Sequence, residues 1–336
     1  MTPAESCPAV SDRRVRTVDG DIPAAELGVT DYHEHMFQAS QLLPGEELDD
    51  EERSASEASM LRQSGFAAMI DATPIGLGRR PAALRRVART ARIRIIATTG
   101  LHKQEHYPED HWVLRADEGT LSAWLIGDLE DGMAVSDERA TRTAVESGIR
   151  AGIIKVGIGY WRITPFERRA IDAAGAAHAR TGAPVMVHLD HGSAGHEVTA
   201  LLAGAGVPAE AVVLAHVDRN PDPYLHADLA AAGAYLGYDG FARHREWPDS
   251  TLIECMLTAA ANGAAERILI GGDVARRTRY RAYDGMPGLA YLGDHVLPRV
   301  RAQTDQATLD RFLIHNPARL LGRFPGCVGL AGSGQG

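Results

Sequence analysis

The sequence is poor in cysteine. Its 336 residues contain only Cys7, Cys255 and Cys327, which lie far apart and in no spacing typical of a metal site. Secreted domains that depend on disulfides carry many more cysteines, whereas a reducing compartment keeps thiols free. Cysteine usage therefore predicts a protein of a reducing compartment without a disulfide framework.

Long apolar runs and an excess of positive charge are also absent. No stretch reaches the ~18 apolar residues that cross a bilayer, and residues 1–9 have neither a basic start nor an apolar segment. The formal net charge is −9, and an acidic body attracts neither nucleic acid nor an anionic membrane. We therefore expect a soluble cytoplasmic protein that binds a small molecule, with no nucleic-acid or membrane partner.

What the chain does contain is an alternation of strand-like and helical patterns. Hydrophobic residues make up 45% of the sequence, which is enough for a large core. The expected core strands end near residues 33, 72, 99, 156, 188, 216, 238 and 271. Helices are expected between them, including two before the fourth strand, near residues 121–128 and 137–147. Strict βα alternation without a linker predicts the α/β class and a single (β/α)8 barrel.

Shorter segments flank this predicted barrel. Residues 14–23 are expected to form a small hairpin, and helical segments follow residue 288 up to residue 322. We expect one domain over residues 14–324, a flexible tail over residues 1–13 and a Gly-rich tail over residues 325–336.

Six polar residues follow the expected strands at the end where a barrel places its active site. They are His33, His35, Lys155, His188, His216 and Asp273. His33 and His35 are two residues apart, so on an extended strand both imidazoles point the same way and can bind one cation. Polar groups crowded on an apolar barrel would be costly without a cation. Histidines and a carboxylate suit zinc first, and manganese, cobalt, nickel or iron as well.

Two candidate ligands leave alternatives open. An ammonium on Lys155 would be repelled by bound cations, but its apolar flanks favour the neutral amine. A neutral amine can add carbon dioxide, and the resulting carbamate can bridge two metals, so we expect a carboxylated Lys155 if two divalent ions are present. The alternative is a lysine paired with a nearby carboxylate. His191 competes with His188 as a ligand, but it lies in a Gly-containing loop beyond the strand end, so we favour His188.

Six motifs in order resemble the phosphotriesterase-related family of the amidohydrolase superfamily, over the range from Arg16 to Phe324. The motifs are His33-Glu34-His35, Lys155 in Gly-Ile-Ile-Lys-Val, His188 after Val187, His216 in Ala-His-Val-Asp-Arg-Asn-Pro, Gly271-Gly272-Asp273, and Asn316-Pro317-Ala318-Arg319. The resemblance implies a more buried metal held by His33, His35 and Asp273, a more exposed metal held by His188 and His216, and carboxylated Lys155 as their bridge. It further implies hydrolysis by a hydroxide between the metals, with Asp273 accepting its proton.

One departure from the family concerns this proton. In true phosphotriesterases, a histidine and an aspartate relay it away from the metal-bound aspartate, and the corresponding residues here are Gly240 and Arg219. The relay is therefore absent. We interpret this as evidence against organophosphate triesters and in favour of lactones, esters or amides.

Several cationic residues follow the expected strands and could bind an anionic substrate. They are Lys103, Arg243, Arg245, Arg276, Arg277 and Arg279. Arginines bind carboxylate or phosphate through forked hydrogen bonds, although each could equally be a solvated charge paired with an acidic neighbour. We predict that at least one of Lys103, Arg243 and Arg276 contacts the substrate. His102, Tyr107 and Trp161 are candidates for the pocket wall.

The favoured function is a binuclear metal-dependent hydrolase of a small lactone or carboxylic ester, with or without a phosphate or carboxylate group. An N-acyl amino acid amidase, a promiscuous phosphotriesterase and a non-catalytic, metal-containing binding barrel stay open as alternatives. The full set of ligands weighs against the last. A nicotinamide-dependent oxidoreductase has little support, because Gly76 and Gly78 lack a third glycine and an acidic partner. A homodimer is the expected assembly.

Overall fold

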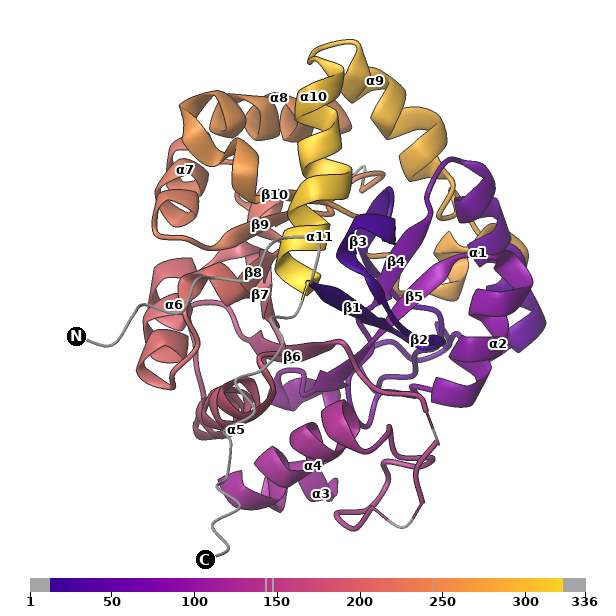
Figure 1. Cartoon of the computed structure of the whole chain (residues 1–336), viewed down its shortest axis with the longest axis vertical. Coiled ribbons are helices and arrows are strands. Elements are labelled where there is room, and N and C mark those ends of the chain that lie inside the picture. Colours follow the sequence, from indigo (N-terminus) through magenta and orange to yellow (C-terminus); the bar gives the residue numbers. More distant parts are fainter. Residues whose placement is uncertain (1–12, 143, 147, 244, 323–336) are drawn as a thin grey trace, which may run out of the picture.

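Eight parallel strands form the centre of the molecule. A computed structural model describes residues 13–142, 144–146, 148–243 and 245–322. Its strands are β3 (Thr30–Glu34), β4 (Ala68–Asp71), β5 (Arg94–Gly100), β6 (Ile153–Ile158), β7 (Val185–Leu189), β8 (Val212–Ala215), β9 (Tyr235–Tyr238) and β10 (Ile268–Ile270), and they pair in sequence order (Figure 1). Parallel strands in this order, joined by helices, curl into a barrel. The predicted (β/α)8 fold is confirmed.

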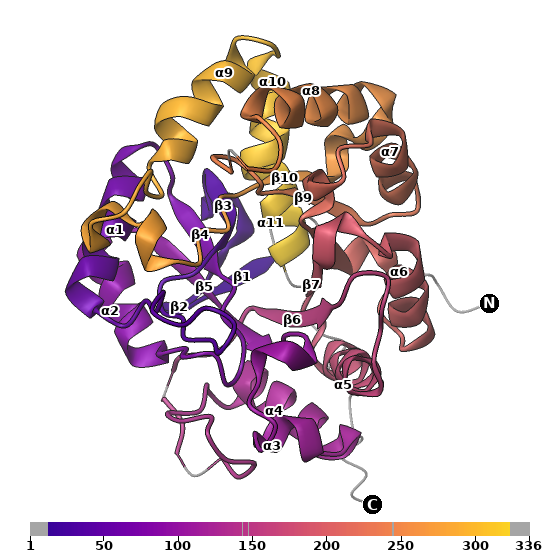
Figure 2. The ribbon, with the colours of Figure 1, turned by 180° about the vertical axis from the view of Figure 1, so that it is seen from behind.

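Helices surround this barrel (Figure 2). They are α1 (Glu51–Gln63), α2 (Pro81–Ala91), α3 (Trp112–Arg115), α4 (Glu118–Glu130), α5 (Pro165–Thr181), α6 (Gly195–Gly204), α7 (Pro223–Ala231) and α8 (Asp249–Ala259), followed by α9 (Leu297–Arg301), α10 (Gln306–Asp310) and α11 (Asn316–Leu321). The longest of them, α5, begins with a reciprocal capping box between Thr164 and Glu167, with Pro165 in its first turn. It ends at Gly182, which adopts the left-handed conformation.

The amino ends of the strands are sealed by apolar residues. The antiparallel hairpin of β1 (Arg14–Thr17) and β2 (Gly20–Pro23) lies with α11 across the barrel (Figure 1). Val15, Leu27 and Leu321 pack there against residues from inside the barrel, and the Val18 N–H donates to Ile95 O at the start of β5. The predicted hairpin and C-terminal helical extension are both present, and the site must lie at the other end.

The barrel closes where β10 meets β3. The Asp273 N–H donates to His33 O at 2.8 Å, and the Val274 N–H donates to Glu34 Oε2 at 2.9 Å. Glu34 is fully buried. These bonds place the segment after β10 directly against the end of β3, so two candidate metal-binding segments meet through backbone contacts.

The predicted helix over residues 137–147 is wrong. The described residues between α4 and β6 form an irregular segment in which Ala134 pairs with Val145 in one antiparallel bridge. The buried Arg79 binds Asp137 at 2.8 Å, and the Trp112 indole N–H donates to the Asp137 carbonyl at 2.7 Å. Because this carbonyl bonds a side chain from elsewhere in the chain, tertiary contacts replace the hydrogen bonds that a helix would form internally.

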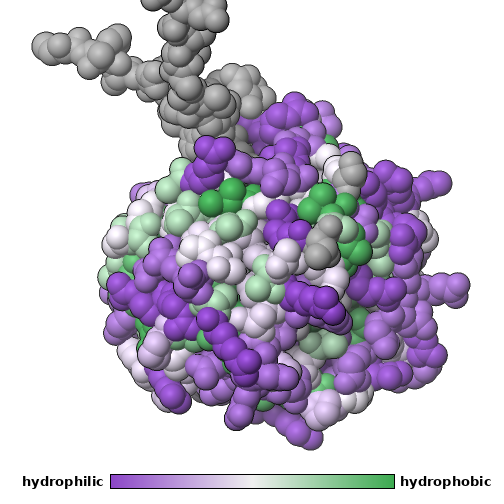
Figure 3. All heavy atoms as spheres, turned by 90° about the horizontal axis from the view of Figure 1, so that it is seen from below, coloured by the Kyte–Doolittle hydropathy of each residue, from purple (hydrophilic) through white to green (hydrophobic). Residues whose placement is uncertain are grey.

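One face of the molecule is mostly hydrophilic. Figure 3 shows a face on which hydrophilic residues predominate, with small and scattered apolar patches. Among the described residues, no helix has the length and apolar character needed to cross a membrane. The predicted tails lie almost wholly outside the described residues, and the domain limits stay a prediction. Cys7 and Cys327 also lie outside, while Cys255 is a buried free thiol.

The closing seam generates a stability prediction. A Cβ atom at Gly272 would lie 2.1 Å from Glu34 Oε1, which is buried and cannot move into solvent. We expect Gly272→Ala to lower the free energy of unfolding by about 1–3 kcal/mol through overpacking, measured by chemical denaturation. Gly204→Ala is the control, because a Cβ there, at the end of α6, meets no atom within 4 Å. Equal effects of the two substitutions would contradict this account of the seam.

Candidate metal centre

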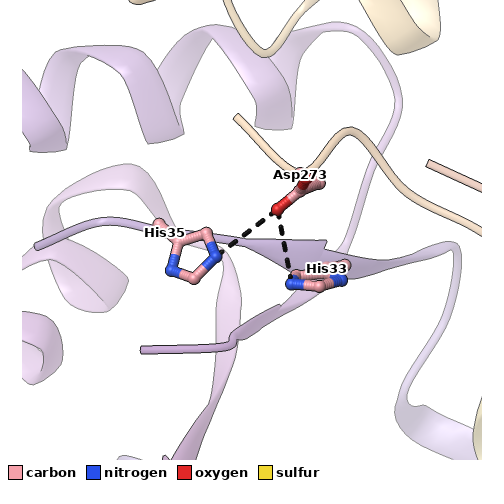
Figure 4. Close-up of side chains that lie close together, drawn as sticks. All are labelled: His33, His35 and Asp273. Carbon is pink, nitrogen blue, oxygen red and sulfur yellow. Dashed lines mark ion pairs between the residues drawn. The ribbon is translucent and has the colours of Figure 1, made fainter. Parts of the chain in front are cut away.

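All six predicted ligands line one cavity of about 280 Å³ formed by the segments that follow the strands. Three of them, His33, His35 and Asp273, lie close together. His33 Nε2 and His35 Nε2 each lie 3.5 Å from Asp273 Oδ1. Figure 4 shows the Asp273 carboxylate directed toward both imidazoles, which come from β3 and its end. One carboxylate and two imidazoles therefore converge on a common point, as a cation requires.

In three of the candidate histidine ligands, the Nδ1 atom is already hydrogen-bonded. His33 Nδ1 lies 3.2 Å from Asp239 Oδ2, and His216 Nδ1 lies 2.7 Å from Asp239 Oδ1. His35 Nδ1 lies 2.9 Å from Thr73 Oγ1. A carboxylate behind a histidine places the proton on the nitrogen that faces it, which leaves the other nitrogen free as a metal ligand. In His33, His35 and His216, that free atom is Nε2.

Asp239 was missed as a site residue in the sequence analysis. It follows β9 directly, so its position at a strand end was a usable signal. Its carboxylate also accepts a hydrogen bond from the Tyr32 hydroxyl, and its backbone N–H donates to Asp218 Oδ2 at 2.9 Å. The ligand atoms of His33, His216 and Asp239 lie within 4.8 Å of one another, as do those of His33, His35 and Asp273. Because Asp239 bonds the Nδ1 atoms, we assign it to orienting the ligands.

In His188, the hydrogen-bonded nitrogen is Nε2 rather than Nδ1. Its Nε2 atom lies 3.1 Å from Asp190 Oδ1, so Nδ1 is the nitrogen left for a metal. Its ring lies 4.6 Å from the ring of His216 and 4.5 Å from that of His102. His188 and His216 therefore belong to one cluster of imidazoles at the cavity. His188 lines the cavity and His191 does not, and the choice of His188 as the ligand stays a prediction.

Lys155 is buried beside these ligands. Its Nζ atom lies 3.0 Å from His33 Nε2 and 3.5 Å from Met186 Sδ. No ion pair joins it to a carboxylate within the part of the chain that the structure describes. Burial lowers the pKa of Lys155 to about 8, which makes the neutral amine accessible near neutral pH.

The donor set fits divalent cations. Burial lowers the pKa of His33 to about 4 and that of His188 and His216 to about 3, so all three are neutral at pH 7. Burial alone would raise the pKa of Asp273, but its interactions with His216 and Arg243 hold it well below the usual range. Neutral imidazoles and an ionised carboxylate are the forms that bind metals, and together they suit zinc and its neighbours.

Two arginines occupy the outer side of Asp273. Arg219 Nη2 donates to Asp273 Oδ2 at 2.6 Å, and Arg243 Nη2 donates to the same oxygen at 2.5 Å. Oδ1 faces the imidazoles and Oδ2 faces the guanidinium groups. The Nε atoms of both arginines are buried and have no hydrogen-bond partner among the described residues. Arg243 was a predicted substrate contact. Arg219 was noted only as the residue that stands in place of the relay aspartate.

The other predicted substrate contacts divide into two groups. His102, Lys103 and Arg276 line the cavity, and Arg279 joins them there. Tyr107 does not line it, because its hydroxyl accepts the His102 N–H at 2.8 Å and donates to a backbone carbonyl at 3.0 Å. The structure places Tyr107 beneath the loop after β5. Trp161, also considered for the wall, is 63% exposed and lies outside the lining.

Comparison with known proteins agrees with this geometry. The model of the phosphotriesterase family matches residues 13–321. A phospho-furanose lactonase from Mycoplasmopsis synoviae is 29% identical over 331 residues, covering 93% of this chain and 92% of the relative. A solved lactonase from Listeria monocytogenes is 28% identical, with a TM-score of 0.84, and covers 93% of this chain and 100% of its own. A solved amidohydrolase from Mycoplasma synoviae is 27% identical, with a TM-score of 0.86. The match covers 93% of this chain and 92% of the amidohydrolase.

The resemblance inferred from the six motifs is thereby confirmed. The family model covers nearly the whole chain, including every motif that carried the inference. The relatives described above are two lactonases and an amidohydrolase. This chain belongs to the phosphotriesterase family of metal-dependent hydrolases.

Proposed function

We propose that the chain is a binuclear metal-dependent hydrolase that opens a small lactone or carboxylic ester carrying an anionic group. The observation that carries this proposal is the composition of one cavity. Histidines, Asp273 and Lys155 converge at its base, and several arginines line the same space. The names of the related lactonases support the lactone as the first choice.

The residues divide between two metal positions. His33, His35 and Asp273 would hold one divalent ion, most simply zinc, and His188 and His216 would hold the second. Bound cations would supply Lewis acidity, which activates water and polarises the substrate carbonyl. Lys155, carboxylated on its neutral amine, would bridge the two positions, and its 3.0 Å approach to His33 Nε2 supports this role. Asp239 and Thr73 keep the imidazole Nε2 atoms available.

Asp273 can exchange a proton only on one side. Arg219 and Arg243 both donate to Oδ2, so this oxygen is engaged by cations and is a poor acceptor for a proton. We assign to Oδ1 the proton of the attacking water. A lactone keeps its leaving oxygen within the same molecule, so Oδ1 can return the proton directly. This arrangement favours a lactone over a phosphotriester, whose leaving group departs.

The arginines define the expected substrate further. Arg219, Arg243, Arg276 and Arg279 come from the segments after β8, β9 and β10 and gather at the cavity, although the protein has a net charge of −9. Arg276 makes no ion pair with another described residue. A guanidinium that is free to fork two hydrogen bonds suits a carboxylate or phosphate. The volume of about 280 Å³ restricts the substrate to a small molecule.

The metal centre generates the next prediction. We expect wild-type protein purified with bicarbonate to contain about two divalent ions per chain and Lys155→Ala to lose both metal and lactone hydrolysis, because the bridge is removed. Elemental analysis and a panel of lactones, esters, amides and phosphotriesters, run on the same samples, measure both. Wild-type protein prepared without carbon dioxide is the control and should load less metal. A metal content unaffected by the substitution would contradict the carbamate bridge.

The arginines generate a prediction about specificity. Arg276→Met should raise the KM for a lactone bearing phosphate or carboxylate about tenfold or more, because a charge-assisted hydrogen bond is lost. The KM for the uncharged analogue should stay constant, and steady-state kinetics on the two substrates measure the difference. Arg301→Met, at an exposed position of α9, is the matched control. An equal change in KM for the charged and uncharged substrates would show that Arg276 does not recognise the anion.

A further inference from the structure

The ammonium of Lys103 is already occupied by carboxylates. Its Nζ atom donates to Asp190 Oδ2 at 2.6 Å and lies 3.4 Å from Glu105 Oε2, and the side chain is only 11% exposed. The other oxygen of Asp190, Oδ1, lies 3.1 Å from His188 Nε2. The three side chains thus form a chain of contacts from lysine to carboxylate to imidazole, and it ends at an expected metal ligand.

We propose that Lys103 is a positioning residue for the more exposed metal, which acts through Asp190 to hold His188 with its Nδ1 atom toward the cation. This inference rests on the proposed binuclear centre. It replaces the expectation that Lys103 binds the substrate anion, since Asp190 and Glu105 already balance the charge of Lys103.

The orientation of His188 needs such a device because it differs from that of the other ligands. His33, His35 and His216 are bonded through Nδ1 and present Nε2, whereas His188 is bonded through Nε2. A free imidazole can rotate to exchange its two nitrogens. A carboxylate fixed at the Nε2 side removes that choice, and it fixes the ring only if the carboxylate itself is held.

Asp190 is held from two directions. Its backbone carbonyl accepts the Ser193 Oγ–H at 2.7 Å and the Ser193 N–H at 3.1 Å, which anchors the turn η4 (Asp190–Gly192). Its carboxylate would still be able to rotate between His188 and solvent. The ammonium of Lys103 on Oδ2 stops that rotation and keeps Oδ1 on the imidazole.

The same loop also contacts the ring of His188. The ring of His102, the neighbour of Lys103, lies 4.5 Å from that of His188, and His102 Nδ1 accepts the Lys103 N–H at 2.8 Å. This close packing depends on Gly157 in β6, because a Cβ atom at that position would lie 2.6 Å from the backbone nitrogen of Lys103. His102 therefore contacts the ring of His188 directly, and Lys103 reaches the same ring through Asp190.

The amino-acid usage of the chain favours a special role for this lysine. Of 35 lysines and arginines, only Lys103 and Lys155 are lysines, and both line the same cavity. A substrate carboxylate or phosphate is bound at least as well by the fork of an arginine. A compact ammonium, in contrast, suits a short contact with one carboxylate oxygen in a confined space.

The test measures zinc binding rather than activity alone. Metal-free full-length protein in bicarbonate buffer is titrated with Zn²⁺ against a chromophoric chelator. We expect Lys103→Met to bind one of its two zinc ions about 10- to 100-fold more weakly than the wild type, the usual effect of losing a residue that orients a ligand. Asp190→Asn should show the same loss. The double variant should lose no more than the weaker-binding single variant, because both act through one contact chain.

A matched control and a kinetic measurement separate this role from substrate binding. Glu105→Gln touches only the outer side of the Lys103 ammonium and should leave both zinc affinities unchanged. At saturating zinc, Lys103→Met should give the same ratio of KM values for the charged and uncharged lactones as the wild type.

When both variants fold, two results would overturn the proposal. Wild-type zinc affinity in Lys103→Met, with a raised KM for the charged lactone only, would return Lys103 to substrate binding. Independent losses that add up in the double variant would show that Lys103 and Asp190 do not act together. If the wild type itself binds fewer than two zinc ions, the proposed binuclear centre is contradicted, and with it the inference about Lys103 that rests on it. If Lys103→Met does not fold, the zinc affinity of Asp190→Asn tests the proposal alone. An unchanged zinc affinity in Asp190→Asn would then overturn the proposal.

Discussion

The metal centre depends on the seam between β3 and β10. His33 and His35 come from one end of the barrel sheet and Asp273 from the other, so these ligands meet only because the barrel closes. Backbone N–H groups of residues 273 and 274 bond directly to His33 O and Glu34 Oε2. Asp31 and Glu34 lie buried together behind this seam, where burial raises the pKa of both. The backbone N–H groups of His33 and Val274 donate to these two carboxyl groups and offset part of the cost of burying them.

Two carboxylates also decide which nitrogen His33, His188 and His216 present. Asp239 faces the Nδ1 atoms of His33 and His216, and Asp190 faces Nε2 of His188. These carboxylates cost free energy to bury, and each is compensated by hydrogen bonds from several partners. The barrel therefore supplies the positions of the ligands, while the residues behind them supply the orientation. A cation can bind without rearrangement only when both conditions are met.

The fold and the candidate ligands could be predicted because both follow from local pattern. Each ligand stands at the end of an apolar strand, and parallel strands in a barrel bring such ends together. The roles of Asp190 and Lys103 could not be predicted, because each role depends on which nitrogen or oxygen atom the side chain faces. The helix expected over residues 137–147 failed for a related reason, because contacts from Arg79 and Trp112 decide the path of that segment.

The Asp273 carboxylate lies between the imidazole cluster and two arginines of the cavity. Its Oδ1 atom faces the imidazoles, where divalent ions would lie, and its Oδ2 atom faces Arg219 and Arg243. Without this negative charge, the guanidinium groups would repel the cations across a few ångströms of low-dielectric space. A substrate that places a carbonyl at the metals and an anionic group at the arginines would span both regions and complete their charge balance. The proposed substrate is accordingly a compact molecule whose reactive carbonyl and negative charge lie a short distance apart.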